Sequence, residues 1–357
     1  MEAGATPDGI DRAGVEGWFA EHVEGVALPL AFEMIAGGRS NLTYSVTDAA
    51  GRRWALRRPP LGKRLGSAHD MGREAKVVSA LAGTPVPVPT VAGFCEDESV
   101  NVAPFYVMDF LPGVVIEEEM PAGYATTPAE RRRIGAALMK TLAALHAVDW
   151  RAVGLADFGR PDGYLARQVR RWSEQWERSK ASELPLVREL ARRLEASLPH
   201  TPAATLVHGD WRLGNVALDQ KDPGRIVAIF DWEMATLGDP LADVGYTLVY
   251  WGEAGDAPGA RGPGSYAAVT AAPGFHTRAE LVEEYSRASG RDIASVDFYE
   301  VLALYKLAVI SEGAYARWRA GLTAGEGFEN VERVSVPLCE AALAIAERSA
   351  LPGLRGA

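Results

Sequence analysis

The sequence predicts an α+β protein of two lobes, in which a small antiparallel sheet with one helix precedes a larger, mainly helical region. Segments rich in strand-forming residues and bounded by turn signals gather before residue 112, and segments with helical periodicity dominate after it. A chain of 357 residues is also longer than one small hydrophobic core usually organises. We therefore expect a first lobe over residues 1–113 and a second lobe over residues 114–357.

The first lobe contains the predicted sheet. Its expected elements are a short amphipathic helix over 11–24, two strands around a turn within 32–60, a helix over 69–83, an extended proline-rich connector over 84–94 and a buried strand over 104–113. Gly83 is a natural helix stop, and Pro112 with Gly113 ends the last strand.

The second lobe is predicted from helix caps and periodicity. Its expected elements are helices over 127–149, 162–180, 277–290 and 297–321, and two short apolar strands over 204–208 and 225–230. Thr127 with Glu130, and Thr277 with Glu280, have the spacing of capping boxes. The stretch 253–275 is rich in Gly, Ala and Pro and is expected to be a loop.

Composition excludes several classes of function. A net charge of −10 is a poor match for nucleic acid or an anionic membrane surface, so we expect neither as a partner. The acidic, polar N-terminus does not resemble a signal peptide, and no apolar run is long enough to span a membrane. The two cysteines, Cys95 and Cys339, lie outside any metal or disulfide pattern. We expect a cytoplasmic protein.

Three oxygen-bearing side chains follow apolar strands. Asp210 and Asn215 lie in "LVHGDWRLGN" (206–215), and Asp231 lies in "RIVAIFDWE" (225–233). Such side chains suit Mg²⁺, which shares its coordination with substrate phosphates, and a carboxylate not needed for the metal can accept a hydroxyl proton. One aspartate alone is more often a turn residue, but the whole pattern predicts a phosphoryl-transfer site.

The motif His-Gly-Asp-x₄-Asn followed by Asp-Trp-Glu resembles the catalytic region of the aminoglycoside phosphotransferase and choline-kinase-like superfamily, which has the protein-kinase-like fold. Gly209 stands where protein kinases have Arg. The segments "LRRPP", "SAHDMGRE", "VPVPTVAGFCED", "FYVMDFLPG" and "DWEMATLGDPLADVGY" are similar to the kinase-like domain that some proteins carry fused to an acyl-CoA dehydrogenase.

This resemblance implies a set of site residues. Asp210 is the expected catalytic residue, and Asn215 and Asp231 are the expected metal ligands. The residues expected to bind ATP are Gly37, Gly38, Ser40 and Asn41 in the nucleotide loop, Arg57 with Glu74 at the phosphates, and Met108, Asp109, Phe110 and Leu111 at the adenine hinge. Arg57 stands where the family usually has Lys. His146, His208, Asp239 and Asp243 are expected to be structural.

The resemblance also implies an activity. We expect an ATP- and Mg²⁺-dependent phosphotransferase acting on the hydroxyl of a small molecule, and the fused relatives suggest a hydroxyacyl-CoA or related hydroxy acid as acceptor. An aminoglycoside O-phosphotransferase is one alternative, and a nucleotide-binding pseudokinase or regulatory module is another. A metal-dependent hydrolase using His208, Asp210, Asp231 and Asp243 is a third. The sequence indicates no oligomeric state.

Overall fold

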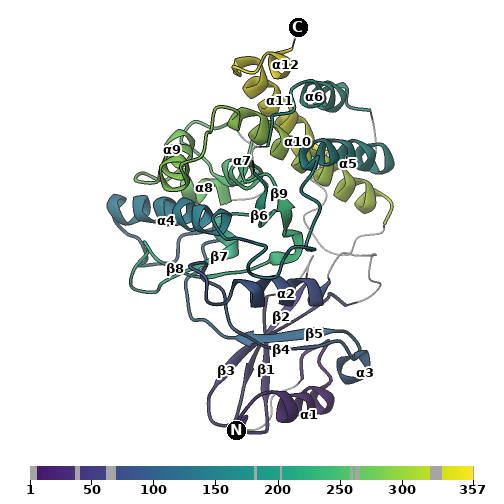
Figure 1. Cartoon of the computed structure of the whole chain (residues 1–357), viewed down its shortest axis with the longest axis vertical. Helices are drawn as coiled ribbons and strands as arrows, with labels where there is room; N and C mark the ends of the chain where they lie inside the picture. Colours follow the sequence, from purple (N-terminus) through teal and green to yellow (C-terminus); the bar gives the residue numbers. More distant parts are fainter. Residues whose placement is uncertain are drawn as a thin grey trace. The chain divides into compact units, whose positions relative to one another are not determined.

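The structure is a computed structural model that describes residues 6–36, 41–61, 70–180, 183–201, 203–257, 260–261, 266–321 and 332–356. The chain forms two compact units (Figure 1). The first unit is Met1–Gly113 with Val227–Ala235, and the second is Val114–Ile226 with Thr236–Ala357. The segment Val227–Ala235, which a division at residue 113 assigns to the second lobe, thus belongs to the first unit.

The first unit is built on a five-stranded sheet in the order β1-β2-β3-β5-β4, with every pair antiparallel. Its elements are α1 (Arg12–His22), β1 (Ala31–Ala36), β2 (Leu42–Thr47), β3 (Arg53–Arg58), α2 (Met71–Leu81), β4 (Val91–Cys95), α3 (Glu98–Asn101), β5 (Phe105–Asp109), β8 (Ile226–Ile229) and the 3₁₀ turn η2 (Trp232–Met234). The predicted antiparallel sheet is confirmed. The region 32–60 holds three strands instead of two, and the expected connector contains β4.

Alternation along the strands gives the sheet two different buried faces. Tyr44, Leu56 and Val107 belong to a core that includes Trp18 and Phe19 of α1. The intervening positions face the other way, where Ala55, Tyr106 and Met108 pack with Met71 and Ala75 of α2. Because side chains alternate with a period of two, this second face is also the face of Arg57. The sheet therefore directs Arg57 toward α2.

The second unit is mainly helical. Its elements are α4 (Pro128–His146), α5 (Tyr164–Ser179), α6 (Pro185–Ala196), β6 (Thr205–Val207), η1 (Leu213–Asn215), β7 (Val216–Leu218), β9 (Thr236–Gly238), α7 (Leu241–Tyr250), α8 (Tyr266–Thr270), α9 (Arg278–Ser289), α10 (Val296–Arg319), α11 (Glu332–Arg348) and α12 (Pro352–Arg355). The buried helix α10 packs against α5, α7 and α11 (Figure 1). Among the described residues, no helix is both long and apolar enough to cross a bilayer.

Local signals in the sequence explain where these helices begin and end. Both capping boxes are present, at Thr127 with Glu130 and at Thr277 with Glu280. Gly290 ends α9 in the left-handed conformation that glycine adopts without strain. The expected helix start and stop signals are thus confirmed for α4 and α9.

A short antiparallel pair positions the loop that follows β6. Leu206 of β6 lies opposite Leu237 of β9, and β9 leads directly into Asp239 and then α7. Gly245 lets α7 approach α10 closely, because a Cβ atom there would lie 2.4 Å from the backbone of Tyr299. This packing fixes the first turn of α7, which carries Asp243.

Candidate active site

In the first unit, Arg57 joins two carboxylates. Its Nε lies 2.8 Å from Oε2 of Glu74 on α2, and its Nη2 lies 2.5 Å from Oδ1 of Asp231. Thr43, its cross-strand neighbour on β2, accepts from Nη1 at 3.3 Å. The fork of the guanidinium makes this double bridge possible, whereas the single ammonium of a lysine is a point charge. The pairing of Arg57 with Glu74 expected from the sequence is present.

The cluster around Arg57 carries more negative than positive charge. Asn41 donates from Nδ2 to Glu74 Oε1 at 2.6 Å and to Glu233 Oε2 at 3.2 Å. Burial raises the pKa of Glu74 to about 7 against the lowering effect of Arg57, and Asp231 and Glu233 add to the rise. Burial would lower the pKa of Arg57, but Glu74, Tyr106 and Asp231 outweigh it and keep the guanidinium charged.

The amide nitrogen of Asn41, expected to donate to nucleotide, is therefore already used within the protein. It connects the end of the nucleotide loop to α2 and to the Asp-Trp-Glu segment. Gly37, Gly38 and Ser40, the other residues expected in that loop, lie outside the described residues.

Asp231 has a backbone conformation that few residues adopt. Its φ is +63°, in the left-handed region, and Asp tolerates this region better than most residues. It follows β8 directly and precedes η2, and its side chain is 22% exposed. Strained positions of this kind gather at functional sites. The carboxylate is thus held by Arg57 and remains accessible.

The predicted adenine hinge spans the end of β5 and the two residues after it. Met108 is buried against α2, and Asp109 donates its backbone N–H to Thr90 at 2.9 Å. The Arg53 guanidinium lies over the ring of Phe110, 3.7 Å from its centroid. Since the Asp109 amide is occupied, the backbone of Phe110 and Leu111 is the better candidate for adenine recognition.

In the second unit, Asp210 and Asn215 form one constellation. The Nδ2 of Asn215 donates to Oδ2 and to the backbone oxygen of Asp210, both at 2.7 Å. Arg212 Nε lies 3.4 Å from the same carboxylate. Within the described chain, no residue donates to Oδ1 of Asn215, so the amide oxygen can serve as a metal ligand.

Asp243 secures the loop that carries Asp210. Its carboxylate accepts from the backbone N–H groups of His208 and Gly209, each at 2.7 Å, and lies 3.2 Å from Nε2 of His146. Burial would raise the pKa of Asp243, but His146, His208 and the Gly209 amide lower it. Gly209 has φ of +85°, which explains glycine at this position.

The structural roles expected for the neighbouring polar residues are confirmed. The ring of His208 accepts from the backbone N–H of Asp210 at 3.3 Å, and His146 is buried between Asp243 and Tyr285. Asp239 accepts from the Leu241 amide at the start of α7 and from the hydroxyl of Tyr299. His208 and Asp243 therefore act as structural hydrogen-bonding residues, which removes two ligands from the hydrolase alternative.

The structure brings the predicted residues together in two groups, one in each unit. Arg57, Glu74, Asn41 and Asp231 meet in the first unit, and Asp210 and Asn215 meet in the second. Convergence of the two groups on one nucleotide stays a prediction. Among the described residues, no three His, Cys, Asp or Glu form a ready metal cage. Mg²⁺ does not require one, because it keeps waters and binds substrate phosphates.

Sequence reasoning missed two side chains beside Asp210. Lys306 of α10 donates to the backbone oxygen of Gly209 at 3.2 Å, and the Tyr246 ring lies 4.4 Å from the Lys306 ammonium. Lys306 is the one cation in the otherwise mostly apolar stretch 296–316. That isolated charge was the signal that could have identified it.

Comparison with known proteins gives the family. The model of the phosphotransferase enzyme family matches residues 32–299. The chain belongs to this family. Acyl-CoA dehydrogenase family member 10 of Mus musculus is 34% identical over 294 residues, which cover 82% of this chain and 27% of that protein. The chain spans less than half the length of the curated relatives it matches.

Solved structures agree with this assignment to the phosphotransferase enzyme family. A crystal structure from Ralstonia eutropha, assigned as an aminoglycoside phosphotransferase, shares 32% identity and a TM-score of 0.80, covering 95% of this chain and 99% of that one. Amicoumacin kinase, solved with AMP-PNP and Ca²⁺, has a TM-score of 0.58 at 15% identity, over 90% of each chain. The predicted α+β, protein-kinase-like fold is confirmed by these neighbours.

Proposed function

We propose that the protein transfers the γ-phosphoryl group of ATP, with Mg²⁺, to a hydroxyl of a small molecule. The observation that carries the proposal is the use of the two ends of the Asn215 amide. Its nitrogen donates to Asp210, so its oxygen can bind a metal ion. Phosphoryl transfer requires a metal ligand beside a catalytic carboxylate.

Each residue has a defined task in this proposal. Asp210 accepts the hydroxyl proton as the acceptor oxygen forms its bond to phosphorus and the bond to the departing ADP breaks. Asn215 and Asp231 would hold Mg²⁺, and the bound metal would neutralise charge on the phosphates. Arg57, positioned by Glu74, contacts the phosphates, and Phe110 and Leu111 hold adenine. Residues 1–113 would thus bind nucleotide, and residues 114–357 would supply the catalytic loop and the acceptor site.

The names of the curated relatives suggest which kind of molecule accepts the phosphoryl group. The curated relatives are acyl-CoA dehydrogenase family members, so we propose a hydroxyacyl-CoA or related hydroxy acid. An aminoglycoside acceptor is the competing proposal, supported by the assignment of the Ralstonia eutropha protein. We propose no nucleic-acid or membrane partner and a cytoplasmic location.

The test measures ADP formation and phosphate transfer in the same samples. Purified protein is incubated with ATP and either Mg²⁺ or a chelator, together with hydroxyacyl-CoAs, hydroxy acids or aminoglycosides, and phosphorus NMR identifies the product. Asp210→Asn serves as the inactive reference. We expect Mg²⁺-dependent transfer to a hydroxy acid or its thioester. ATP binding without transfer or hydrolysis would instead favour the pseudokinase alternative. That alternative is supported by the presence of arginine at position 57, where the family usually has lysine.

A further inference from the structure

Lys306 places a positive charge beside the proposed catalytic carboxylate. It lies in the middle of α10, and its Nζ donates to the backbone oxygen of Gly209, the residue before Asp210, at 3.2 Å. Burial lowers the pKa of Lys306, whereas the nearby charges of Asp210 and Asp243 raise it and Arg171 of α5 lowers it. Both carboxylates thus lie within electrostatic reach of the ammonium.

The protein uses only part of the hydrogen-bonding capacity of this ammonium. A lysine has three N–H donors, and in the described part of the chain the Gly209 oxygen is the one acceptor of a hydrogen bond from Lys306. No described carboxylate forms an ion pair with it. Two aromatic rings flank it instead, with centroids 4.4 Å away at Tyr246 and 5.7 Å away at Trp172. Such rings stabilise a cation without consuming its N–H donors.

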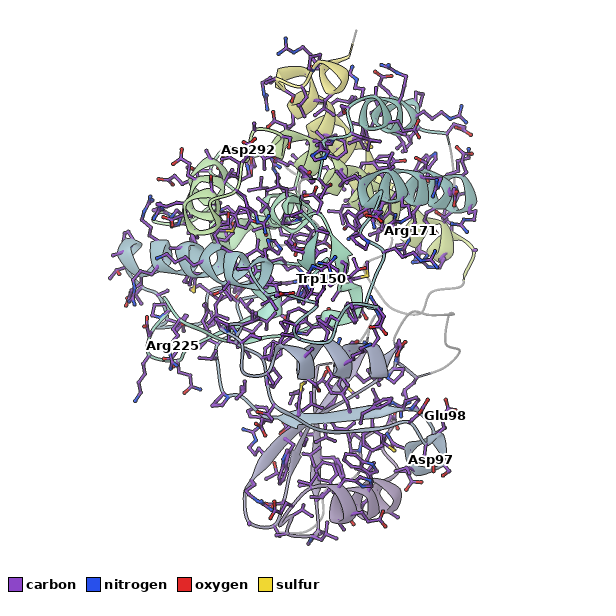
Figure 2. The ribbon with its side chains drawn as sticks, viewed as in Figure 1. Asp97, Glu98, Trp150, Arg171, Arg225 and Asp292 are labelled. Carbon is purple, nitrogen blue, oxygen red and sulfur yellow. The ribbon has the colours of Figure 1, made fainter. Side chains whose placement is uncertain are left out.

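Two arginines add positive charge near Lys306 and Asp210. Asp243 already accepts two backbone hydrogen bonds and lies against His146, so its carboxylate is engaged within the protein. Arg212 Nε lies 3.4 Å from Asp210, and Arg171 projects from α5 (Figure 2). Lys306 and Arg212 therefore both lie near the Asp210 carboxylate, and Arg171 lies within electrostatic reach of Lys306. A positively charged acceptor at Asp210 would be repelled by them, and a negatively charged acceptor would be attracted.

We propose that Lys306 determines acceptor specificity by binding an anionic oxygen group of the acceptor, a carboxylate or a phosphate, while Asp210 receives the hydroxyl. The inference rests on the proposed function and extends it, since it names the side chain that distinguishes anionic from cationic acceptors. Lys306 takes no part in breaking or forming the bonds to phosphorus. It is the acceptor's negative charge, and not its chain length, that this residue recognises.

The experiment compares acceptors that differ in charge at one end. Short hydroxycarboxylates are compared with their neutral amides and with the corresponding cationic amino alcohols. For each acceptor, kcat and KM are measured with the wild type, Lys306→Met, Lys306→Arg and the control Lys221→Met. Lys221 is exposed in a turn. Hydroxyalkyl phosphates replace the carboxylates in a second arm, which identifies the preferred anion.

We expect the wild type to prefer the anionic member of each set. The preference is measured as kcat/KM for the carboxylate divided by kcat/KM for its amide. Lys306→Met should reduce this preference by about 10–100-fold, mainly by raising KM for the carboxylate, because a hydrogen bond to a charged group is lost. Lys306→Arg should restore part of the ratio, and Lys221→Met should leave it unchanged. The KM for ATP should stay constant throughout.

Other outcomes contradict the inference in recognisable ways. If Lys306→Met lowers kcat equally for all three acceptor types and for acceptor-free ATP hydrolysis, the residue only supports the catalytic loop through Gly209. A wild-type preference for amino alcohols would also overturn it. If no acceptor is phosphorylated, the proposed function fails, and calorimetric titration of hydroxycarboxylate into wild type and Lys306→Met then decides the inference by itself: equal affinities reject it.

Discussion

Arg57 and Asp231 form an ion pair, with 2.5 Å between Nη2 and Oδ1, although 174 residues separate them in the chain. The same guanidinium binds Glu74 through Nε, so the proposed metal ligand and the helix carboxylate share one cation. This relationship makes it possible to separate binding of the metal–nucleotide complex from binding of the nucleotide alone.

Asp231→Ala should weaken binding of MgATP by roughly tenfold or more, because the proposed metal loses its charged ligand. Metal-free ATP should bind no worse than to the wild type, since a negative charge next to the phosphates is removed and Arg57 loses a competing partner. Calorimetric titration of ATP with Mg²⁺ and with chelator measures both. Unchanged affinity for MgATP together with weaker binding of free ATP would show that Asp231 is not a metal ligand.

Arg57→Met should destabilise the first unit by about 1–3 kcal/mol, because Glu74 would lose its cation and take up a proton in the buried site. The double variant Arg57→Met with Glu74→Met should recover much of that stability, since both charges are then absent. Urea unfolding measures the free energies. Arg53→Met, an exposed arginine on the same strand, is the matched control. A single variant as stable as this control would contradict the buried ion pair.

Asp210→Asn should reduce turnover by about 10²–10⁴-fold and leave ATP affinity nearly intact, as expected when a general base is lost. The side-chain amide of Asn215 can still donate to the new residue, so the loop should keep its shape. Asp292→Asn is the control, because Asp292 is exposed and Asn can replace it in its hydrogen bond to the Ala294 amide (Figure 2). Wild-type turnover in Asp210→Asn would refute the catalytic assignment.

His146 should make stability fall as pH falls below about 6.5. Burial lowers the pKa of His146 in the folded protein, against the raising effect of Asp243. Between this lowered pKa and the unfolded value near 6.5, the unfolded chain binds a proton that the folded chain does not, so the free energy of unfolding decreases as pH falls, by at most ~1.4 kcal/mol per pH unit. Burial lowers the pKa of His276 as well, which acts in the same direction.

Urea unfolding of His146→Gln across the same pH range tests this contribution. The variant should lose about 1–3 kcal/mol at neutral pH, because the bonds to Tyr285 and Asp243 change, and its stability should depend less steeply on pH. His200→Gln, at an exposed position, should keep the wild-type slope. Equal slopes in His146→Gln and wild type would exclude His146 as the source.

The sequence predicted the parts of the fold that carry strong local signals. Capping boxes indicated the starts of α4 and α9, and strand-forming residues bounded by turn signals identified β2, β3 and β5. β1 was missed because its residues are mostly exposed and lack a regular apolar face, and β4 because Gly93 and the preceding prolines resemble a connector. Both lie at the edges of the sheet, where burial imposes the weakest pattern.

Local sequence signals also predicted only part of the candidate site. The pairing of Arg57 with Glu74 followed from their order in a familiar pattern, and the alternation of β3 explains it physically. Neither the second bond of Arg57 to Asp231 nor the donation of Asn41 to Glu233 could be read from local sequence, since each joins residues far apart in the chain. Lys306 was missed for the same reason, because helical periodicity places it in a packed helix without identifying Gly209 as its neighbour.

The two amide groups held by Asp243 have a consequence for local unfolding. Loops usually exchange their amide protons through small openings that need little free energy, but the His208 and Gly209 amides can open only if a buried carboxylate in the first turn of α7 loses its donors. The loop and the start of that helix should therefore open as one cooperative unit. Its amide protons should exchange with solvent as slowly as those of α7, so adaptation to different acceptors has to come from side chains or from other segments.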